Sequence, residues 1–216
     1  MTSPRDTNDL IEALALDAGP APRVSPRLVG AAALGGIAAF VLVAAWLGFR
    51  PDIAEAPASR MFWMKAFYTS LLGLGGFLCV ERLSRPVGSP RGGLILAVSV
   101  FVLLAAVGLF RFMHADPADR MPMLMGASWR VCPRNIVVLG LPILAATLLA
   151  VRSLAPTRLT WAGAAAGLFS GGVAATIYGL HCPEHTMAFV AVWYSLGIAL
   201  VTALGAIAGP WALRWR

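Results

Sequence analysis

Residues 178–185 read YGLHCPEH, a short polar interruption between two long apolar runs of the chain. The interruption places a thiol, two imidazoles and a carboxylate within five residues. A second polar stretch, WRVCPR at 129–134, lies earlier in the chain. Each stretch holds a Cys-Pro pair, and proline disfavours helix-interior geometry for itself and for the residue before it. The two stretches are therefore predicted to stand at the ends of apolar helices.

The composition is typical of a membrane protein. Of 216 residues, 59% are hydrophobic and 12% are charged, whereas soluble domains carry roughly 25% charged residues. A soluble fold could not hide this much apolar surface, so membrane lipid is an expected partner. The net charge is +7, but the basic residues are spread between the apolar runs. Because they form no dense patch, direct binding of nucleic acid is not expected.

Six apolar runs predict six membrane-spanning helices. Each is close to the roughly 20 residues that cross about 30 Å of hydrocarbon. The runs cover residues 28–49, 61–80, 93–112, 135–151, 159–180 and 187–211. The expected fold class is all-α: a polytopic membrane protein with a six-helix transmembrane bundle at 28–216, which follows a polar segment at 1–27.

The distribution of arginine and lysine predicts the orientation, because these residues are enriched in cytoplasmic loops. With the N-terminus inside, ten of the 17 basic residues fall on the inner side and seven on the outer side. The loop at 82–91 and the closing residues 214–216 give the clearest bias. Both termini are therefore expected to be cytoplasmic, which places Cys132 and Cys182 together on the outer, oxidising side. Cys79, at the inner end of the second run, is expected to be a packing residue.

The polar N-terminal segment contains a predicted short helix at 6–15. Leu10, Ile11 and Leu14 form one narrow apolar stripe on it, and Asp6 or Thr7 is placed to cap it. Such a helix is too short to be stable alone in water. Two interpretations remain open: a frayed tail or lipid-surface helix, and a docking helix that becomes ordered on a partner.

The thiols Cys132 and Cys182 are the first candidate site. They can form a disulfide if their Cα atoms come within about 7 Å, and that bond would join the start of the fourth span to the end of the fifth. One interpretation is a permanent structural disulfide or a pair of unreactive thiols. The other is a redox or soft-metal trigger, because such a bond would change the geometry between helices.

A tentative metal site combines these two thiols with His181 and His185. Imidazole and thiolate are suitable ligands for soft or borderline metals, but the spacing matches no strong metal motif. The alternative is that the histidines hydrogen-bond to loop backbone. No obligatory cofactor is expected, only a transient soft metal ion at the cysteines.

Other polar residues receive simpler interpretations. Lys65, near the start of the second run, is expected to extend toward the membrane interface. Glu184 is expected to be solvated or to pair with Arg130 or Arg134. Trp193 and Tyr194 are aromatic residues of the interface or core, placed to pack beneath the 181–186 loop.

Catalytic motifs are absent from the sequence, so an enzyme is not expected. One alternative is a membrane thiol oxidoreductase that passes electrons to quinone, although such enzymes usually need a second thiol pair. The other is a small soft-metal transporter, although the runs offer few polar residues at mid-membrane.

Several segments together resemble the NrsF family of bacterial anti-sigma factors. They are DLIEALA at 9–15, WRVC at 129–132, YGLHCPE at 178–184, Phe189, Trp193-Tyr194, Gly197-Ile198 and Leu213-Arg214-Trp215. The resemblance extends over nearly the whole chain and is most specific around residues 180–182.

The resemblance implies a six-helix protein of the bacterial inner membrane that holds an extracytoplasmic-function sigma factor inactive. It implies that the N-terminal segment at 1–27 binds the sigma factor, and that Cys132 and Cys182 take part in sensing metal or oxidative stress. The partner-binding residues would then be Asp9, Leu10, Ile11, Glu12, Leu14 and Asp17.

Overall fold

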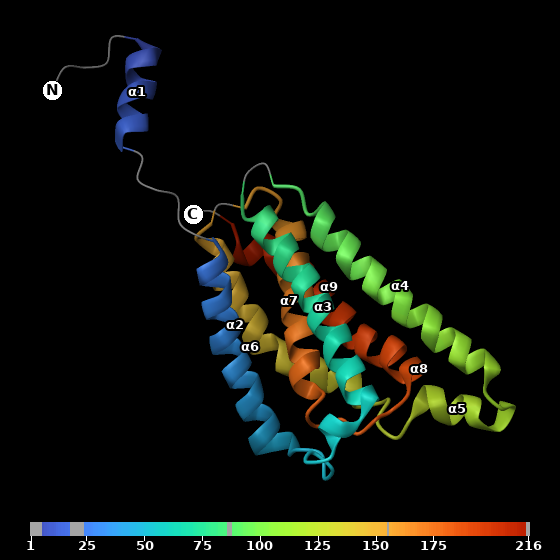
Figure 1. Cartoon of the computed structure of the whole chain (residues 1–216). Coiled ribbons are helices and arrows are strands. Elements are labelled where there is room, and N and C mark those ends of the chain that lie inside the picture. The colour runs from blue at the N-terminus through green and yellow to red at the C-terminus, as the bar shows by residue number, and fades with distance from the viewer. Residues whose placement is uncertain (1–5, 18–23, 86–87, 155, 215–216) are drawn as a thin grey trace.

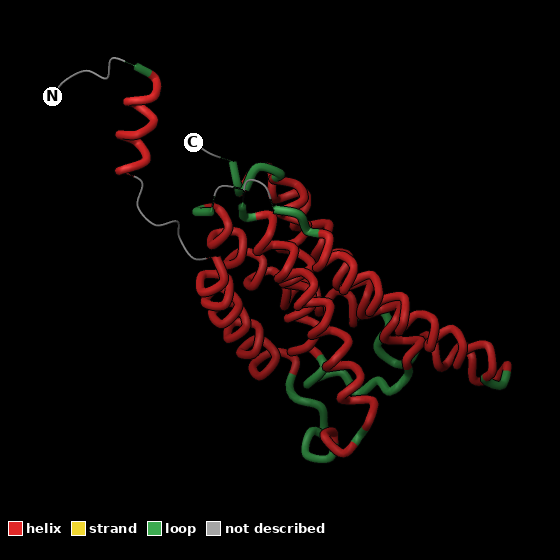
Figure 2. Tube along the Cα trace, turned by 45° about the horizontal axis from the view of Figure 1, so that its top comes forward, coloured by secondary structure: helices red, strands yellow, loops and turns green. Residues whose placement is uncertain are grey.

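A computed structural model describes residues 6–17, 24–85, 88–154 and 156–214. All the regular secondary structure in these residues is helical, with loops between the helices and no β-strand (Figures 1 and 2). The long helices are α2 (Val24–Leu42, continued by the π-helix η1, Val43–Leu47), α3 (Arg60–Leu83), α4 (Arg91–His114), α6 (Cys132–Arg152), α7 (Leu159–Tyr178) and α9 (Ser195–Ala212). The short elements are α1 (Thr7–Asp17), the 3-10 helix η2 (Ala56–Ala58), α5 (Pro117–Met125), α8 (Met187–Phe189) and the π-helix η3 (Val190–Tyr194).

The long helices run alternately up and down the bundle (Figure 1). We call one end of the bundle the tail end: it holds the start of α2, the ends of α3 and α6, and the end of α9. The opposite end holds the loops at 48–59, 115–131 and 179–186, and we call it the thiol end. Helix α1 stands apart from the bundle, beyond the tail end (Figure 1).

Five of the described helices are long and apolar enough to cross a membrane. They are Val24–Leu47, Arg60–Leu83, Arg91–His114, Cys132–Arg152 and Met187–Ala212. Each of the six predicted apolar runs lies in a helix, but α7, which holds the run at 159–180, is not among the five. Its sequence is dominated by alanine and glycine, and many of its side chains are buried inside the bundle. A helix surrounded by protein needs less apolar surface than one that faces lipid.

Close helix approach at glycine holds α7 in the bundle. A Cβ atom built at Gly172 would lie 2.5 Å from the Cα atom of Gly73 on α3, and one at Gly163 would lie 2.8 Å from the Cα atom of Gly209 on α9. Both are far below ordinary van der Waals separation, so only glycine permits these backbone contacts. This spacing of small residues places α3 and α9 directly against α7.

The buried residues form two clusters, one toward each end. The cluster at the thiol end contains Cys132 and Cys182, and the cluster at the tail end contains Val24, Leu28 and Cys79. Cys79 is therefore a buried residue, as expected. Large apolar side chains remain exposed along the outer faces, among them Leu34 on α2 and Leu103 on α4, which is the pattern of surfaces that meet lipid.

Helix boundaries differ from the predicted runs because polar residues extend several helices. Helix α2 begins at Val24, before the predicted start at 28. Pro26 is tolerated in its first turn because N–H groups there have no partner within the helix, so the missing N–H of proline costs nothing. The segment at 113–134, between the third and fourth predicted runs, contains α5. The Asp17 side chain and residues 18–23 of the polar N-terminal segment lie outside the described part of the chain.

Candidate functional site

Cys132 and Cys182 meet at the thiol end. Cys132 is the first residue of α6, and Cys182 lies in the loop between α7 and α8. Both are free thiols with no exposed surface, and their side chains are neighbours in the buried cluster at the thiol end. The Ser128 hydroxyl oxygen lies 3.9 Å from the Cys182 sulfur. The structure thus brings together the two thiols that the sequence singled out.

Local backbone geometry positions each thiol. The N–H groups of His181 and Cys182 both donate to the Tyr178 carbonyl oxygen, at 3.0 and 3.1 Å, which turns the chain at the end of α7. The N–H of Cys132 donates to the Ser128 carbonyl oxygen at 2.9 Å. Pro133 follows in the first turn of α6, a position where its missing N–H costs nothing. The Cys-Pro pairs therefore mark helix ends, as predicted.

Two buried tyrosines lie against the thiols. Tyr178 ends α7 and Tyr194 ends the π-helix η3; both are fully buried, with ring centroids 5.7 Å apart. The Tyr194 hydroxyl lies beside the Cys182 thiol but has no well-aligned hydrogen-bond partner among the described residues. Trp193, on the same turn, donates from its indole nitrogen to the Leu124 carbonyl oxygen at 2.8 Å. Of the two aromatic residues predicted to pack beneath the loop, Tyr194 lies beside Cys182, whereas Trp193 contacts Leu124 and Trp129.

Lys65 holds the Cys182 loop on α3. Its Nζ atom donates to the carbonyl oxygens of Cys182 at 2.9 Å and of Glu184 at 2.8 Å. The side chain is only 2% exposed and lies 6.0 Å from the centroid of the Tyr194 ring. The expectation that Lys65 extends to the interface is therefore wrong. The bundle buries it because two backbone carbonyls satisfy its ammonium group, and a buried ammonium group without such partners is costly.

Glu184 connects the same loop to the segment that leads into α6. Its Oε1 atom accepts from the N–H of Ala127 at 2.8 Å, from the N–H of Ser128 at 3.0 Å, and from the Ser128 hydroxyl at 2.9 Å. The predicted partners of Glu184 were solvent or the nearby arginines. Backbone N–H groups take that place because the chain turns there at Gly126, whose φ of +54° favours glycine.

Arg50 fixes the third loop of the thiol end. Its guanidinium group donates to both carboxylate oxygens of Asp52, at 2.7 and 2.6 Å, and its backbone N–H donates to the Leu180 carbonyl oxygen at 3.1 Å. This hydrogen-bonded pairing raises the pKa of Arg50 and lowers that of Asp52 to about 2. Nearby, the His181 ring nitrogen Nδ1 lies 2.8 Å from the Gly48 carbonyl oxygen.

The surroundings of Cys182 favour its thiolate. The hydrogen bond from the Cys132 thiol lowers the pKa of Cys182, burial opposes this, and the charge of Lys65 lowers it further. A thiolate is the reactive form of cysteine. Two adjacent thiols can join as a disulfide when they lose two protons and two electrons to an oxidant. That is the reaction for which this arrangement is best suited.

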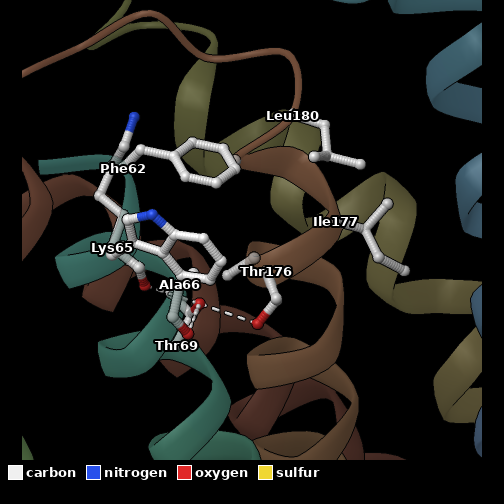
Figure 3. A pocket seen from close by; sticks show the side chains of 10 residues that line it. Phe62, Lys65, Ala66, Thr69, Thr176, Ile177 and Leu180 are labelled. Atoms are coloured by element: carbon white, nitrogen blue, oxygen red, sulfur yellow. Dashed lines mark hydrogen bonds between the residues drawn. The ribbon is translucent and has the colours of Figure 1, made fainter. Parts of the chain in front are cut away.

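An apolar hollow lies beside Lys65, between α3 and α7 (Figure 3). Its volume is about 320 Å³, and its lining includes Phe62, Trp63 and Leu180. Its polar edge is formed by Thr69 and Thr176, whose hydroxyl oxygens lie 2.8 Å apart. The hollow therefore adjoins the Lys65 contact, and its walls have the polarity of lipid-facing surface.

Comparison with known proteins identifies the family. The family model described as "Negative regulator of sigma F" matches residues 14–215. The chain belongs to the NrsF family. It is 53% identical over 212 residues to the anti-sigma-F factor NrsF of Caulobacter vibrioides, an alignment that covers 97% of this chain and 99% of that protein. It is 39% identical, with the same coverage, to the probable anti-sigma-F factor NrsF of Azospira oryzae. No solved structure matches.

The histidines of this NrsF chain stand apart from the thiols. His181 is turned to Gly48 and packs on the Tyr178 ring, with centroids 5.6 Å apart, while His185 is exposed. Among the residues that the structure describes, no three His, Cys, Asp or Glu side chains are grouped closely enough to hold a metal ion. The structure thus brings the two sulfur atoms together without the two imidazoles.

The predicted partner-binding stripe of this NrsF chain lies on α1. Leu10, Ile11 and Leu14 are 45%, 59% and 61% exposed, and Asp9 and Glu12 are exposed on the same helix. The apolar stripe therefore has no partner inside the described chain. Three apolar side chains that stay exposed on a short helix are typical of a docking segment.

Sequence reasoning missed Lys65, Glu184 and Arg50 as residues of the site. One signal was available for Lys65, because a charged residue inside an apolar run is a functional candidate by default. The roles of Glu184 and Arg50 depend on loops that are distant in sequence, and no local pattern indicates those contacts.

Proposed function

We propose that this chain is an anti-sigma factor that sequesters an extracytoplasmic-function sigma factor at the bacterial inner membrane and releases it when Cys132 and Cys182 react. The observation that carries the proposal is family membership over residues 14–215, together with relatives that are named as anti-sigma-F factors. Membership of this family favours a regulatory role over catalysis. The orientation in this proposal keeps both termini cytoplasmic and six helices in the membrane.

Helix α1 is the segment proposed to hold the sigma factor. Its stripe of Leu10, Ile11 and Leu14 would be buried in the complex, and burial of one such side chain contributes roughly 1.5–3 kcal/mol. Asp9, Glu12 and Asp17 would face the basic surface with which a sigma factor contacts DNA. Charge complementarity of this kind speeds association and excludes wrong partners.

The trigger is proposed to be disulfide formation between Cys132 and Cys182. The two buried thiols are neighbours in one cluster, and the presence of Cys132 lowers the pKa of Cys182 and so favours its ionisation. A soft metal ion is the second trigger considered for this site. The two thiolates would then supply sulfur ligands. His181 or His185 would supply a nitrogen ligand only after the loop at 179–186 rearranges. The grouping of the thiols without the histidines favours oxidation.

The docking claim is tested by placing a charge in the stripe. Leu10→Asp should reduce co-purification of the neighbouring sigma factor by at least about 30-fold, since loss of one buried leucine contact is worth roughly 2 kcal/mol or more. Leu16→Asp is the matched control, because Leu16 is 85% exposed and lies on the side of α1 opposite the middle of the stripe formed by Leu10, Ile11 and Leu14. If Leu10→Asp retains the sigma factor as well as Leu16→Asp does, α1 is not the docking segment.

A further inference from the structure

The two thiols are attached to different helices. Cys132 is part of α6, of which it is the first residue. The backbone around Cys182 is held on α7, because the Cys182 N–H donates to the Tyr178 carbonyl oxygen, and on α3, where the buried Nζ atom of Lys65 donates to the carbonyl oxygens of Cys182 and Glu184. A change in the distance between the Cys132 and Cys182 backbones therefore moves α6 relative to α3 and α7 at the thiol end, or breaks the Lys65 contacts.

The same two helices contact the first turn of α2 at the tail end. On one side, the Ser25 hydroxyl donates to the Glu81 carboxylate of α3 at 3.2 Å. On the other, the Arg27 guanidinium donates at 2.7 Å to the hydroxyl of Ser153, the residue that follows α6. The apolar residues of this turn, Val24 and Leu28, are buried in the cluster at the tail end. The same cluster contains Val80 and Leu83 of α3 and Val151 of α6.

Each helix is a continuous connection from one end of the bundle to the other. Lys65 and Glu81 are 16 residues apart on α3, which corresponds to about 24 Å at 1.5 Å per residue. Midway along α3, Gly76 lies so close to the α7 backbone at Phe169 that no side chain would fit there. Because packed helices shift as rigid rods, a displacement at the thiol end reaches the tail end.

We propose that the first turn of α2, residues 24–28, is the output site of the thiol pair. Lys65 transmits the position of Cys182 through α3 to Ser25, and α6 transmits the position of Cys132 to Arg27. Helix α2 follows α1 in the chain, so a shift of its first turn changes how α1 is presented. This inference rests on the proposed function and names the route that function requires.

The test separates the thiol reaction from sigma-factor release. Full-length protein in membranes is treated with the thiol oxidant diamide. Disulfide formation is measured by labelling the remaining free thiols after denaturation, and the sigma factor that stays bound is measured by co-purification. The output variant is Glu81→Ala/Ser153→Ala, which removes both hydrogen bonds to the first turn of α2 and leaves the tail sequence intact. The input variant is Lys65→Met.

Both variants should form the Cys132–Cys182 disulfide yet release at least about fivefold less sigma factor than the wild type, the lower range of coupling between linked sites. The matched control is Ser170→Ala on α7, whose buried hydroxyl donates only within its own helix, to the Ala166 carbonyl oxygen; it should release like the wild type. The inference is overturned if the output variant forms the disulfide and releases the sigma factor as the wild type does. If the wild type forms the disulfide without release, the proposed function itself fails.

Discussion

Replacing Gly76 by alanine tests the close packing of α3 on α7 that positions Lys65 at the thiol end. A Cβ atom at Gly76 would lie 2.7 Å from the Cα atom of Phe169 and 2.8 Å from the carbonyl carbon of Leu168. Both neighbours are backbone atoms, so no side chain can move aside. The two helices would have to separate by more than 0.7 Å to restore ordinary contact near 3.4 Å, because the backbone nitrogen of Phe169 lies closer still.

The expected cost follows from two opposing effects. Overpacking costs about 1–3 kcal/mol, and the better helix propensity of alanine returns up to about 1 kcal/mol. The net loss of roughly 1–2 kcal/mol corresponds to a fall in Tm of about 3–6 °C for a chain of this size. The measurement is thermal unfolding of the detergent-solubilised protein.

Gly30→Ala is the control for this prediction. A Cβ atom at Gly30, on α2, has no neighbour within 4 Å, so the same substitution should leave Tm unchanged or raise it. Equal Tm values for the two variants would refute the packing argument, because they would mean that α3 and α7 are not in backbone contact at Gly76.

Three further predictions concern the thiol end. Glu184→Ala removes three hydrogen bonds to the segment before α6. Since each bond is worth roughly 1 kcal/mol, the variant should form the disulfide with diamide at least about tenfold more slowly. An unchanged rate would show that Glu184 does not hold the thiols together. Thiolate absorbance from Cys182 should titrate with a midpoint below the ordinary cysteine pKa of about 8.5. The midpoint should rise in Cys132→Ala, because this variant removes the largest cause of the lowered pKa. A midpoint at or above about 8.5 in the wild type contradicts this. Asp52→Asn should lower Tm at neutral pH because it weakens the pairing of Arg50. Since the pKa of Asp52 is lowered to about 2, the stabilising contribution of the ionised pair is complete above about pH 4 and is lost as pH falls toward 2. The Tm difference between variant and wild type should therefore shrink in acid. A constant difference would exclude the ionised pair as its source.

The sequence predicts the helical fold well because the apolar runs match the length of a span. The run predicted at 61–80 lies in a helix from Arg60 to Leu83. The polar residues at the ends of this helix were not predicted, because the helix continues beyond the apolar residues. The run that forms α7 is rich in alanine and glycine, and it is apolar enough to be recognised as a helix. The run alone does not show that its small residues pack the helix between α3 and α9.

The thiol pair was also predictable, since Cys132 and Cys182 each precede proline at a helix boundary on the same side. The histidines show the limit of that reasoning. Their closeness in sequence to Cys182 suggested a tentative metal site, with hydrogen bonds to loop backbone as the alternative. The turn after Tyr178 directs His181 to the Gly48 carbonyl oxygen, a backbone contact of the second kind. Lys65 is held by carbonyl groups more than a hundred residues away in the chain, a contact that only the packing of α3 on α7 creates.

In the proposed mechanism, reaction of the two thiols releases the sigma factor, and co-purification measures that release. The detergent-solubilised protein is purified together with its neighbouring sigma factor, and the wild type is compared with Cys132→Ser/Cys182→Ser, each with and without diamide or cadmium. The account predicts that both proteins hold the sigma factor and that only the wild type releases it on treatment. If the double variant releases it equally, or if the wild type never retains a sigma factor, the account is wrong.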